Sequence, residues 1–380
     1  MTGRERMAAA MRPGAGVMPD RVPVMCQLAL GHYFLHAGIP PHQVWHDSDA
    51  FADALVRLQQ RYRFDGILVN LPGREPDWRL YVRSIEPRDG AEVIRWQNGR
   101  RTVVPPNDNP YALGADGTRP PRPAFASIQL ASLFYVEPHD LHGLTRWEQL
   151  SPWCSATVGR VRERAPDISL HAEVFSPFSQ LMELFGCEAG MLALLDDPAK
   201  VSAALERLTV GAAAVARSHL AEGADALLIS SAYAGGGLIS RRHYEQFVLP
   251  SERVLIARVK QDFPDRPVYT HTCGAIGDRL DLMEQTGTDG IDALDPPPLG
   301  TVDLAEAKRS VGSRLFLKGN VDPVNTVLRG KPHECYVEAR KRIEIAAPGG
   351  GFVLSTACSV PPEAPAANVL ELARAARDAA

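Results

Sequence analysis

The 380-residue sequence has no run of 18 or more apolar residues, so it offers no segment long enough to span a membrane as a helix. It also lacks a large excess of either charge. The 41 basic and 45 acidic residues give a formal net charge of −4, so we expect neither nucleic acid nor a membrane surface as a partner. A signal-peptide core is missing as well, because the apolar run at 7–11 ends at Arg12 and Pro13. These absences predict a cytoplasmic protein.

Cysteine is scarce, with six residues spread over the chain. In a reducing compartment these are expected to be thiols or metal ligands rather than disulfides. Hydrophobic residues make up 45% of the chain and charged residues 23%, which is typical of a globular protein and excludes a disordered or fibrous one.

Short β-rich runs alternate with helical patterns along the chain, and this rhythm predicts parallel βα units. Eight such runs, seven of them followed by a helical pattern, predict an α/β fold that closes as a (β/α)₈ TIM barrel; an open doubly wound sheet is the structural alternative. The expected strands are 22–28, 66–70, 169–174, 225–229, 267–270, 290–293, 315–318 and 351–355. The expected helices are 49–63, 180–185, 199–222, 241–262 with a kink or break at Pro250, 276–286, 303–309, 333–346 and 368–380.

The connection between the second and third strands interrupts this rhythm. Residues 74–168 are too many for a normal βα loop, and they include two β-rich runs, 91–96 and 101–104, on either side of Asn98-Gly99, a strong β-hairpin signal. We therefore expect one barrel domain over residues 1–380 with a hairpin-containing insertion at 74–168, which would cap the site or contact a partner.

Function in such a barrel is expected where the strands end at their C-terminal edge. Residues with polar or metal-binding side chains at or just past the predicted strand ends are Gln27, Asn70, Glu173, Ser230, Ser231, His271, Cys273, Asp292, Asp295, Asn320, Asp322 and Cys358. Among them we interpret Glu173 and Asp292 as candidate catalytic carboxylates. Gln27, Asn70 and Asn320 are the candidate substrate-binding residues.

His271 and Cys273 are two residues apart in an extended segment, so both side chains leave the same face, and Cys358 leaves the eighth strand toward the same rim. One imidazole and two thiolates suit Zn²⁺, and three protein ligands with one open position are typical of a catalytic zinc site. The alternative is structural: a packed, hydrogen-bonded histidine and two cysteines that act as small hydrophobic residues. The remaining four cysteines are expected to pack, and the histidines at positions 32, 36, 42 and 46 to be solvated or to cap helices.

The chain resembles the uroporphyrinogen decarboxylase superfamily, and within it the zinc methyltransferase branch whose type enzymes are methylcobamide:coenzyme M methyltransferases. The matching segments are Arg21-Val-Pro-Val24, Ser176-Pro-Phe178, His271-Thr-Cys273-Gly274, Asp289-Gly-Ile-Asp292, Lys318-Gly-Asn-Val-Asp-Pro323 and Cys358. This resemblance implies a barrel with the site at its mouth and a zinc ion held by His271, Cys273 and Cys358.

The sequence also departs from these relatives. The decarboxylase branch carries an arginine-rich segment after the first strand and an aspartate past the second, and neither is found in residues 28–33 or 69–73. A porphyrinogen decarboxylase is therefore disfavoured. The Asp-x-His-x-x-Gly signature of corrinoid-binding domains is missing too, so a cobamide would arrive on a separate partner protein.

These features predict a zinc-dependent methyltransferase that moves a methyl group from a corrinoid on a separate protein to a small thiol. Two alternatives stay open. One is a metal-free decarboxylase or lyase with Asp292 or Glu173 as the proton donor. The other is a non-catalytic barrel that binds a corrinoid or tetrapyrrole, with the insertion as its docking surface.

Overall fold

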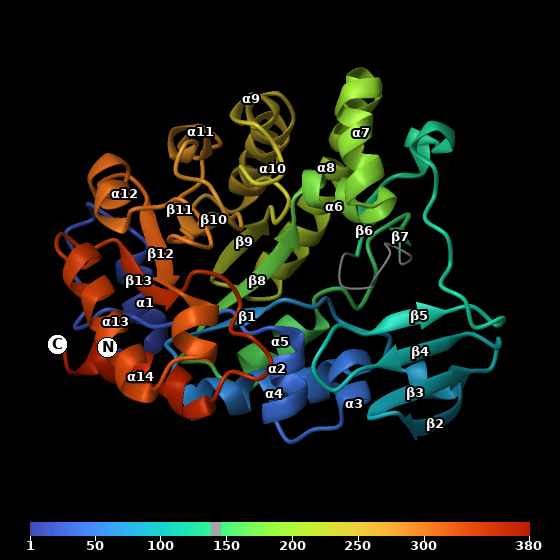
Figure 1. Ribbon diagram of the computed structural model, residues 1–380, viewed down its shortest axis with the longest axis horizontal. Coiled ribbons are helices and arrows are strands. Elements are labelled where there is room, and N and C mark those ends of the chain that lie inside the picture. The colour runs from blue at the N-terminus through green and yellow to red at the C-terminus, as the bar shows by residue number, and fades with distance from the viewer. Residues whose placement is uncertain (138–145) are drawn as a thin grey trace.

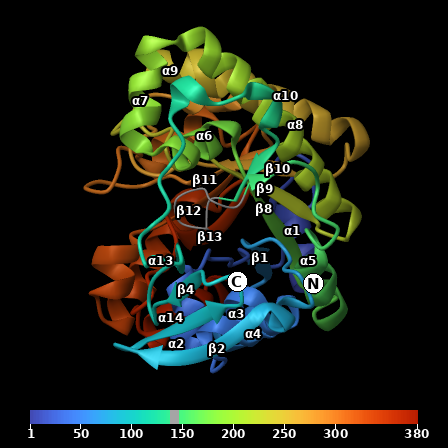
Figure 2. The ribbon, with the colours of Figure 1, turned by 90° about the vertical axis from the view of Figure 1, so that its right-hand side faces the viewer.

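The predicted β-rich runs pair side by side in one parallel sheet. The computed structural model describes residues 1–137 and 146–380, and in these residues seven strands follow one another in the order β1-β8-β9-β10-β11-β12-β13. Their bounds are β1 (Gly66–Val69), β8 (Ser169–Phe175), β9 (Ala226–Ser230), β10 (Val268–His271), β11 (Gly290–Ala293), β12 (Phe316–Val321) and β13 (Phe352–Thr356). The sheet curls into a half-barrel with helices on its outer side (Figures 1 and 2). Because its order never reverses, the doubly wound alternative is wrong.

The predicted first strand, 22–28, does not form a regular ladder. It is an extended segment beside β13, with isolated parallel bridges from Val24 to Leu354 and from Leu28 to Val360. On its other side the amide of Asp65, just before β1, donates to the carbonyl of Val24. Pro23 has no amide hydrogen to offer, which explains in part why the pairing stays discontinuous.

The predicted helices cover the outside of the sheet. The described helices are α1 (Gly3–Ala10), α2 (Leu30–His36), α3 (Pro41–His46), α4 (Ser48–Tyr62), α5 (Ala156–Arg164), α6 (Pro177–Phe185), α7 (Cys187–Asp196), α8 (Pro198–Ala221), α9 (Arg241–His243), α10 (Leu249–Asp262), α11 (Leu280–Glu284), α12 (Leu304–Ser310), α13 (Pro332–Ala346) and α14 (Ala366–Arg377). A π-helical turn, Tyr244–Val248, separates α9 from α10, so the pattern at 241–262 breaks just before Pro250. The helix expected at 276–286 is shorter, since α11 begins at Leu280 and ends at Glu284.

The chain between β1 and β8 carries an antiparallel sheet of its own, at the right of Figure 1. Its order is β2-β3-β4-β5, with bounds β2 (Val82–Arg88), β3 (Ala91–Trp96), β4 (Arg101–Val104) and β5 (Tyr111–Leu113). The two runs that flank Asn98-Gly99 are β3 and β4, which pair antiparallel. A two-stranded sheet, β6 (Tyr135–Val136) with β7 (Arg146–Trp147), follows.

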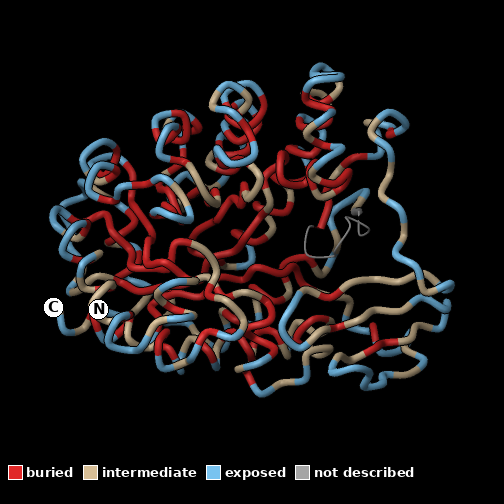
Figure 3. Tube along the Cα trace, in the orientation of Figure 1, coloured by how far each residue is buried: buried red, intermediate tan, exposed pale blue. Residues whose placement is uncertain are grey.

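Two apolar cores result from the alternation of side chains along the strands. The larger core lies between the strands and the helices. The smaller one fills the inside of the curled sheet with Met25, Leu68, Ala226, Leu228, Tyr269, Phe316 and Val353, and α1 closes it with Met7 and Ala10. Burial follows these layers, since the strands of the parallel sheet are buried and the outer surfaces of the helices are exposed (Figure 3).

No single helix in the described ranges is both long and apolar enough to cross a membrane. By length and composition alone, α6 and α7 pass that test together, as a pair bent by 111°.

Candidate functional site

Polar side chains form a layer inside the curled sheet, above the small apolar core. Alternate residues of a strand share a face, so the residue two positions after an inward apolar side chain also points inward. Leu68, Leu228 and Tyr269 belong to the inner core. The inward-facing residues nearest the C-terminal strand ends are therefore Gln27, Asn70, Glu173, Ser230, His271, Asp292, Lys318, Asn320 and Ser355. The strand register supports this layer, because His271 is paired with Ser230 on one side and with Asp292 on the other.

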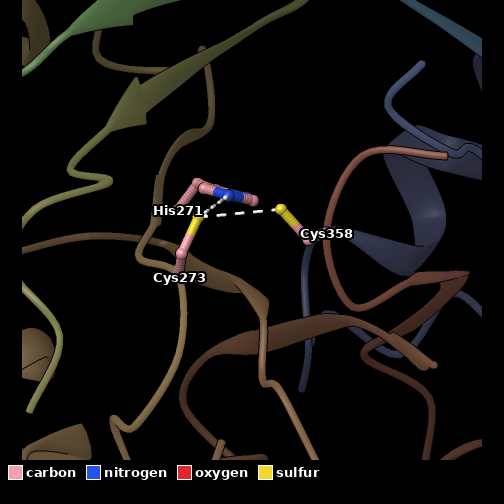
Figure 4. Close-up of side chains that lie close together, drawn as sticks. All are labelled: His271, Cys273 and Cys358. Atoms are coloured by element: carbon pink, nitrogen blue, oxygen red, sulfur yellow. Dashed lines mark hydrogen bonds between the residues drawn. The ribbon is translucent and has the colours of Figure 1, made fainter. Parts of the chain in front are cut away.

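His271, Cys273 and Cys358 meet at this rim. His271 is the last residue of β10, Cys273 follows it by two positions, and Cys358 lies two residues past β13. The Nε2 atom of His271 is 3.3 Å from Sγ of Cys273, which is 3.6 Å from Sγ of Cys358. Figure 4 shows the three side chains pointing toward one another, His271 and Cys273 from one segment and Cys358 from another. All three donor atoms lie within 4.8 Å of one another, and both thiols are free and only partly buried.

These distances fit a tetrahedral zinc ion. Zn–S bonds of about 2.3 Å and Zn–N bonds of about 2.0 to 2.1 Å place two tetrahedral sulfur ligands about 3.8 Å apart and a sulfur and a nitrogen ligand about 3.6 Å apart. The observed S···S and N···S separations of 3.6 and 3.3 Å are slightly shorter. The donor set and its spacing therefore suit the metal implied by the sequence resemblance.

Two buried charges behind the imidazole fix its position. Nδ1 of His271 lies 3.1 Å from Oδ2 of Asp292, and Nζ of Lys318 lies 2.8 Å from Oδ1 of the same carboxylate. Burial alone would raise the pKa of Asp292, but Lys318 and the contact with His271 outweigh it and lower this pKa to about 2. Asp292 is thus ionised, which suits a positioning role for the ring better than proton donation.

The ionisation of the three metal-binding side chains is linked. Burial opposes the charged form of His271, but its contacts with Asp292 and Cys358 raise its pKa to about 10. The hydrogen bond from Cys273 and the imidazolium lower the pKa of Cys358 well below its usual value, whereas the contact with Cys358 and burial raise that of Cys273. The thiolate of Cys358 therefore lies beside the protons of His271 and Cys273, which a bound cation would displace.

The other predicted site residues surround this cluster. Glu173 is buried on β8, and burial raises its pKa to about 7, although His271 and a hydrogen bond with Ser230 act to lower it. Asn70 directly follows β1, and Asn320 belongs to β12. The side-chain oxygens Oε1 of Gln27, Oδ1 of Asn70, Oε2 of Glu173 and Oδ1 of Asn320 are buried and have no hydrogen-bond partner among the described residues.

The sequence predicts no role for Lys318, although this residue opens the matching segment Lys318–Pro323. Its signal lies in the alternation of β12, where Lys318 is two residues before Asn320 and so shares its inward face. A buried lysine at that position needs a carboxylate, and Asp292 is paired with it in the register.

The remaining cysteines and histidines lie outside the layer. Cys26, Cys154 and Cys335 are in the outer core, as expected for packing residues. The expectation of solvated or capping histidines is wrong for His32, which is buried against the carbonyl of Pro361 and the hydroxyl of Tyr62. His46 is stacked on Trp78. Helix α2 turns His32 into the core, a direction that the spacing of the histidines alone does not give.

Comparison with known proteins identifies the family. Residues 129–379 match the model of the family described as uroporphyrinogen decarboxylase (URO-D). The chain belongs to the uroporphyrinogen decarboxylase family. A uroporphyrinogen decarboxylase of Thioalkalivibrio sulfidiphilus is 31% identical over 171 residues, 44% of this chain and 46% of that protein.

Methyltransferases are also among the relatives. The methylcobamide:CoM methyltransferase MtbA of Methanosarcina acetivorans is 26% identical over 212 residues, 56% of this chain and 59% of that protein. These two sequence matches thus span about half the length of each relative. A solved methyltransferase from Methanosarcina mazei has the same fold, with a TM-score of 0.73 and 20% identity over 100% of this chain and 99% of that one. The relatives support a methyl-transfer role within the family.

Proposed function

We propose that this protein is a zinc-dependent methyltransferase that moves a methyl group from a corrinoid carried on a separate protein to a small thiol. The observation that carries the proposal is the spacing of the donor atoms of His271, Cys273 and Cys358, which fits a tetrahedral zinc ion. The similarity to a methylcobamide:CoM methyltransferase supports the choice of a corrinoid donor and a thiol acceptor.

The three residues would hold zinc and leave one position for the thiol. A zinc ion bound there would lower the pKa of an incoming thiol, so that the nucleophilic thiolate is present near neutral pH. Asp292 would hold the His271 ring in its ligating orientation, and Lys318 would balance the charge of Asp292. Asp295 accepts a hydrogen bond of 2.6 Å from the amide of Gly274, which fixes the loop that carries Cys273.

The reaction balances without an added oxidant or reductant. The thiol loses its proton, its sulfur forms a bond to the methyl carbon, and the cobalt–carbon bond breaks with both electrons left on the corrinoid. Glu173 is buried on β8, in the same inward layer as His271, and we assign it to position the thiol, whose proton passes to solvent.

Metal analysis of cysteine variants tests this proposal. We expect the wild-type protein to hold zinc in a stoichiometric amount, and Cys273→Ala and Cys358→Ala each to lose the metal and the transfer of methyl from methylcobalamin to a thiol. Cys187→Ala is the matched control, because Cys187 is also free and partly buried but belongs to α7. Undiminished zinc in either ligand variant would refute the ligand assignment.

The second candidate is a metal-free decarboxylase or lyase. The identity to uroporphyrinogen decarboxylases and the buried carboxyl of Glu173 favour it. It requires Glu173 rather than the cysteines, so a protein that releases CO₂ from a carboxylate substrate after complete removal of metal, and keeps this activity in Cys358→Ala, would favour the lyase.

A further inference from the structure

Most of the unpartnered side-chain oxygens of the polar layer belong to amide or carboxyl groups and accept hydrogen bonds; the hydroxyl of Ser355, also without a partner among the described residues, can donate as well. The amide of Asn320 is oriented by its Nδ2 atom, which donates to the carbonyl of Leu294 at 2.8 Å, and that of Asn70 by a longer contact of 3.5 Å to the carbonyl of Leu28. Both therefore turn Oδ1 away from these partners, and no described residue donates a hydrogen bond to it. Glu173 contributes a third such oxygen, Oε2.

Two of these acceptors lie side by side. The register of β1 and β8 pairs Gly66 with Ser169 and Val69 with Ala172, so the next pair in the same register is Asn70 with Glu173. Paired residues of neighbouring strands point to the same face about 5 Å apart, within the reach of one bound group. Only β9 separates β8 from β10, which ends at His271, so this pair lies in the same inward layer as the metal-binding cluster.

The cations of the layer are already engaged. The inward-facing cationic side chains on the seven parallel strands are His271 and Lys318, and both contact the carboxylate of Asp292. No arginine occurs in any of these strands. An anionic group in the layer would therefore face Asn70, Glu173 and Asn320 with no free cation on the strands to bind it, and the burial of such a charge is costly.

We propose that the acceptor thiol carries a cationic, hydrogen-bond-donating head group, an amine, rather than a sulfonate or a carboxylate. This inference rests on the proposed function and names its substrate class. A primary ammonium group has three donors, which can satisfy the oxygens of Asn70 and Glu173 together. Buried acceptors without partners destabilise a fold, and an ammonium group at this position removes that penalty.

Equilibrium binding of three thiols of equal chain length tests the proposal. Calorimetry on the full chain supplied with Zn²⁺ would compare 2-aminoethanethiol, 2-mercaptoethanol and 2-mercaptoethanesulfonate. We expect the amine to bind most tightly and the sulfonate most weakly, with at least about a tenfold ratio between them, the smallest factor expected from a hydrogen bond to a charged group. A sulfonate that binds as tightly as the amine, or the failure of all three thiols to bind, would overturn the proposal.

The three thiols also differ in acidity, so a pair of isosteric variants is needed to separate the effect of the head group on binding from the effect of thiol acidity. Glu173→Gln removes the charge but not the shape, and we expect it to reduce the amine-to-sulfonate preference about tenfold or more with little change for 2-mercaptoethanol. Glu252→Gln is the control, because Glu252 is a buried carboxyl on α10, bonded to Ser231 and Tyr244 outside the inward layer. Equal loss of preference in both variants would also contradict the proposal.

Methyl transfer from methylcobalamin, measured separately, distinguishes failure of the amine preference from failure of the proposed methyltransferase function. Transfer with the sulfonate as the best acceptor would refute the amine preference and leave the methyltransferase standing. Preferential binding of the amine without any transfer would refute the methyltransferase and leave the assigned head-group site.

Discussion

The two halves of the space inside the curled sheet differ sharply although the same strands build both. In the lower half, Leu68, Leu228, Tyr269, Phe316 and Val353 pack together and α1 closes the end. Two residues further along those strands, the side chains are polar and include the candidate metal ligand His271. Two residues along each strand thus separate side chains that stabilise the fold from side chains that are candidates for binding a metal or a substrate.

The difference also has an energetic side. Each large apolar side chain that is fully buried in the lower half contributes about 1.5 to 3 kcal/mol. In the upper half, Oδ1 of Asn70, Oε2 of Glu173 and Oδ1 of Asn320 are buried without partners among the described residues, at a cost of about 1 to 3 kcal/mol each. Sites that bind ligands commonly give up stability in this way. The upper half is therefore where substitutions should affect stability and binding differently.

The largest expected effect comes from the charge pair beneath the metal-binding cluster. Asp292→Asn leaves the ammonium of Lys318, which is 1% exposed, without a counter-ion. We expect a loss of about 3 to 5 kcal/mol in the free energy of unfolding, measured by urea denaturation. Because the imidazole also loses its carboxylate, zinc affinity should fall about 10- to 100-fold.

A lower-half variant is the control for this prediction. Leu228→Ala opens a cavity in the inner core and should cost about 2 to 5 kcal/mol, with zinc content unchanged in the folded protein. The double variant Asp292→Asn with Lys318→Met should recover much of the stability but not the zinc affinity. Full zinc affinity in Asp292→Asn would contradict the positioning role.

A smaller effect, visible through pH, is expected at the boundary between the halves. His171 is fully buried between Ser169 and the hydroxyl of Tyr269, and burial lowers its pKa from 6.5 to about 3. Below pH 6.5 the unfolded chain therefore binds a proton that the fold excludes, so stability falls as the pH falls toward 3, by about 1.4 kcal/mol per pH unit over most of that window.

The measurement is the free energy of unfolding at pH 7 and pH 5. We expect the wild type to lose about 2 kcal/mol more than His171→Asn between these values. His333→Gln, which removes an exposed histidine on α13, is the control for the loss of one imidazole. Equal losses in the wild type and His171→Asn would show that His171 is protonated in the fold.

Much of this arrangement follows from sequence periodicity. Each strand from β1 to β13 in the parallel sheet overlaps a predicted run, since short apolar runs bounded by helical patterns leave little other choice. The alternation within those runs also predicts that Asn70, Glu173 and His271 lie at one rim. That Cys358 reaches Cys273 depends on the curl of the sheet, and the resemblance to relatives indicated this contact better than the spacing did.

The features that could not be predicted from the sequence depend on contacts between distant segments. The discontinuous pairing of 22–28 reflects Pro23 and the isolated bridges to Leu354 and Val360. The burial of His32 depends on its contact with the carbonyl of Pro361. Likewise, the role of Asp292 is set by Lys318, a residue 26 positions away that burial forces into an ion pair. Sequence periodicity predicts the direction of a side chain, whereas the residue that it contacts is determined by the tertiary fold.

The smallest expected change in stability tests most directly whether the upper half is built for binding. Asn70→Leu keeps the branched shape of the side chain but removes an amide whose oxygen has no partner among the described residues and whose nitrogen is at the limit of hydrogen bonding, 3.5 Å from the carbonyl of Leu28. We expect the free energy of unfolding to stay within about 1 kcal/mol of the wild type, or to rise, while 2-aminoethanethiol binds at least about tenfold more weakly. The reverse swap two residues earlier, Leu68→Asn, places an amide in the inner core and should destabilise the fold by well over about 1 kcal/mol without a direct effect on the thiol. If Asn70→Leu proved the more destabilising of the two, Asn70 would be a structural residue and the two halves would not differ in the way proposed.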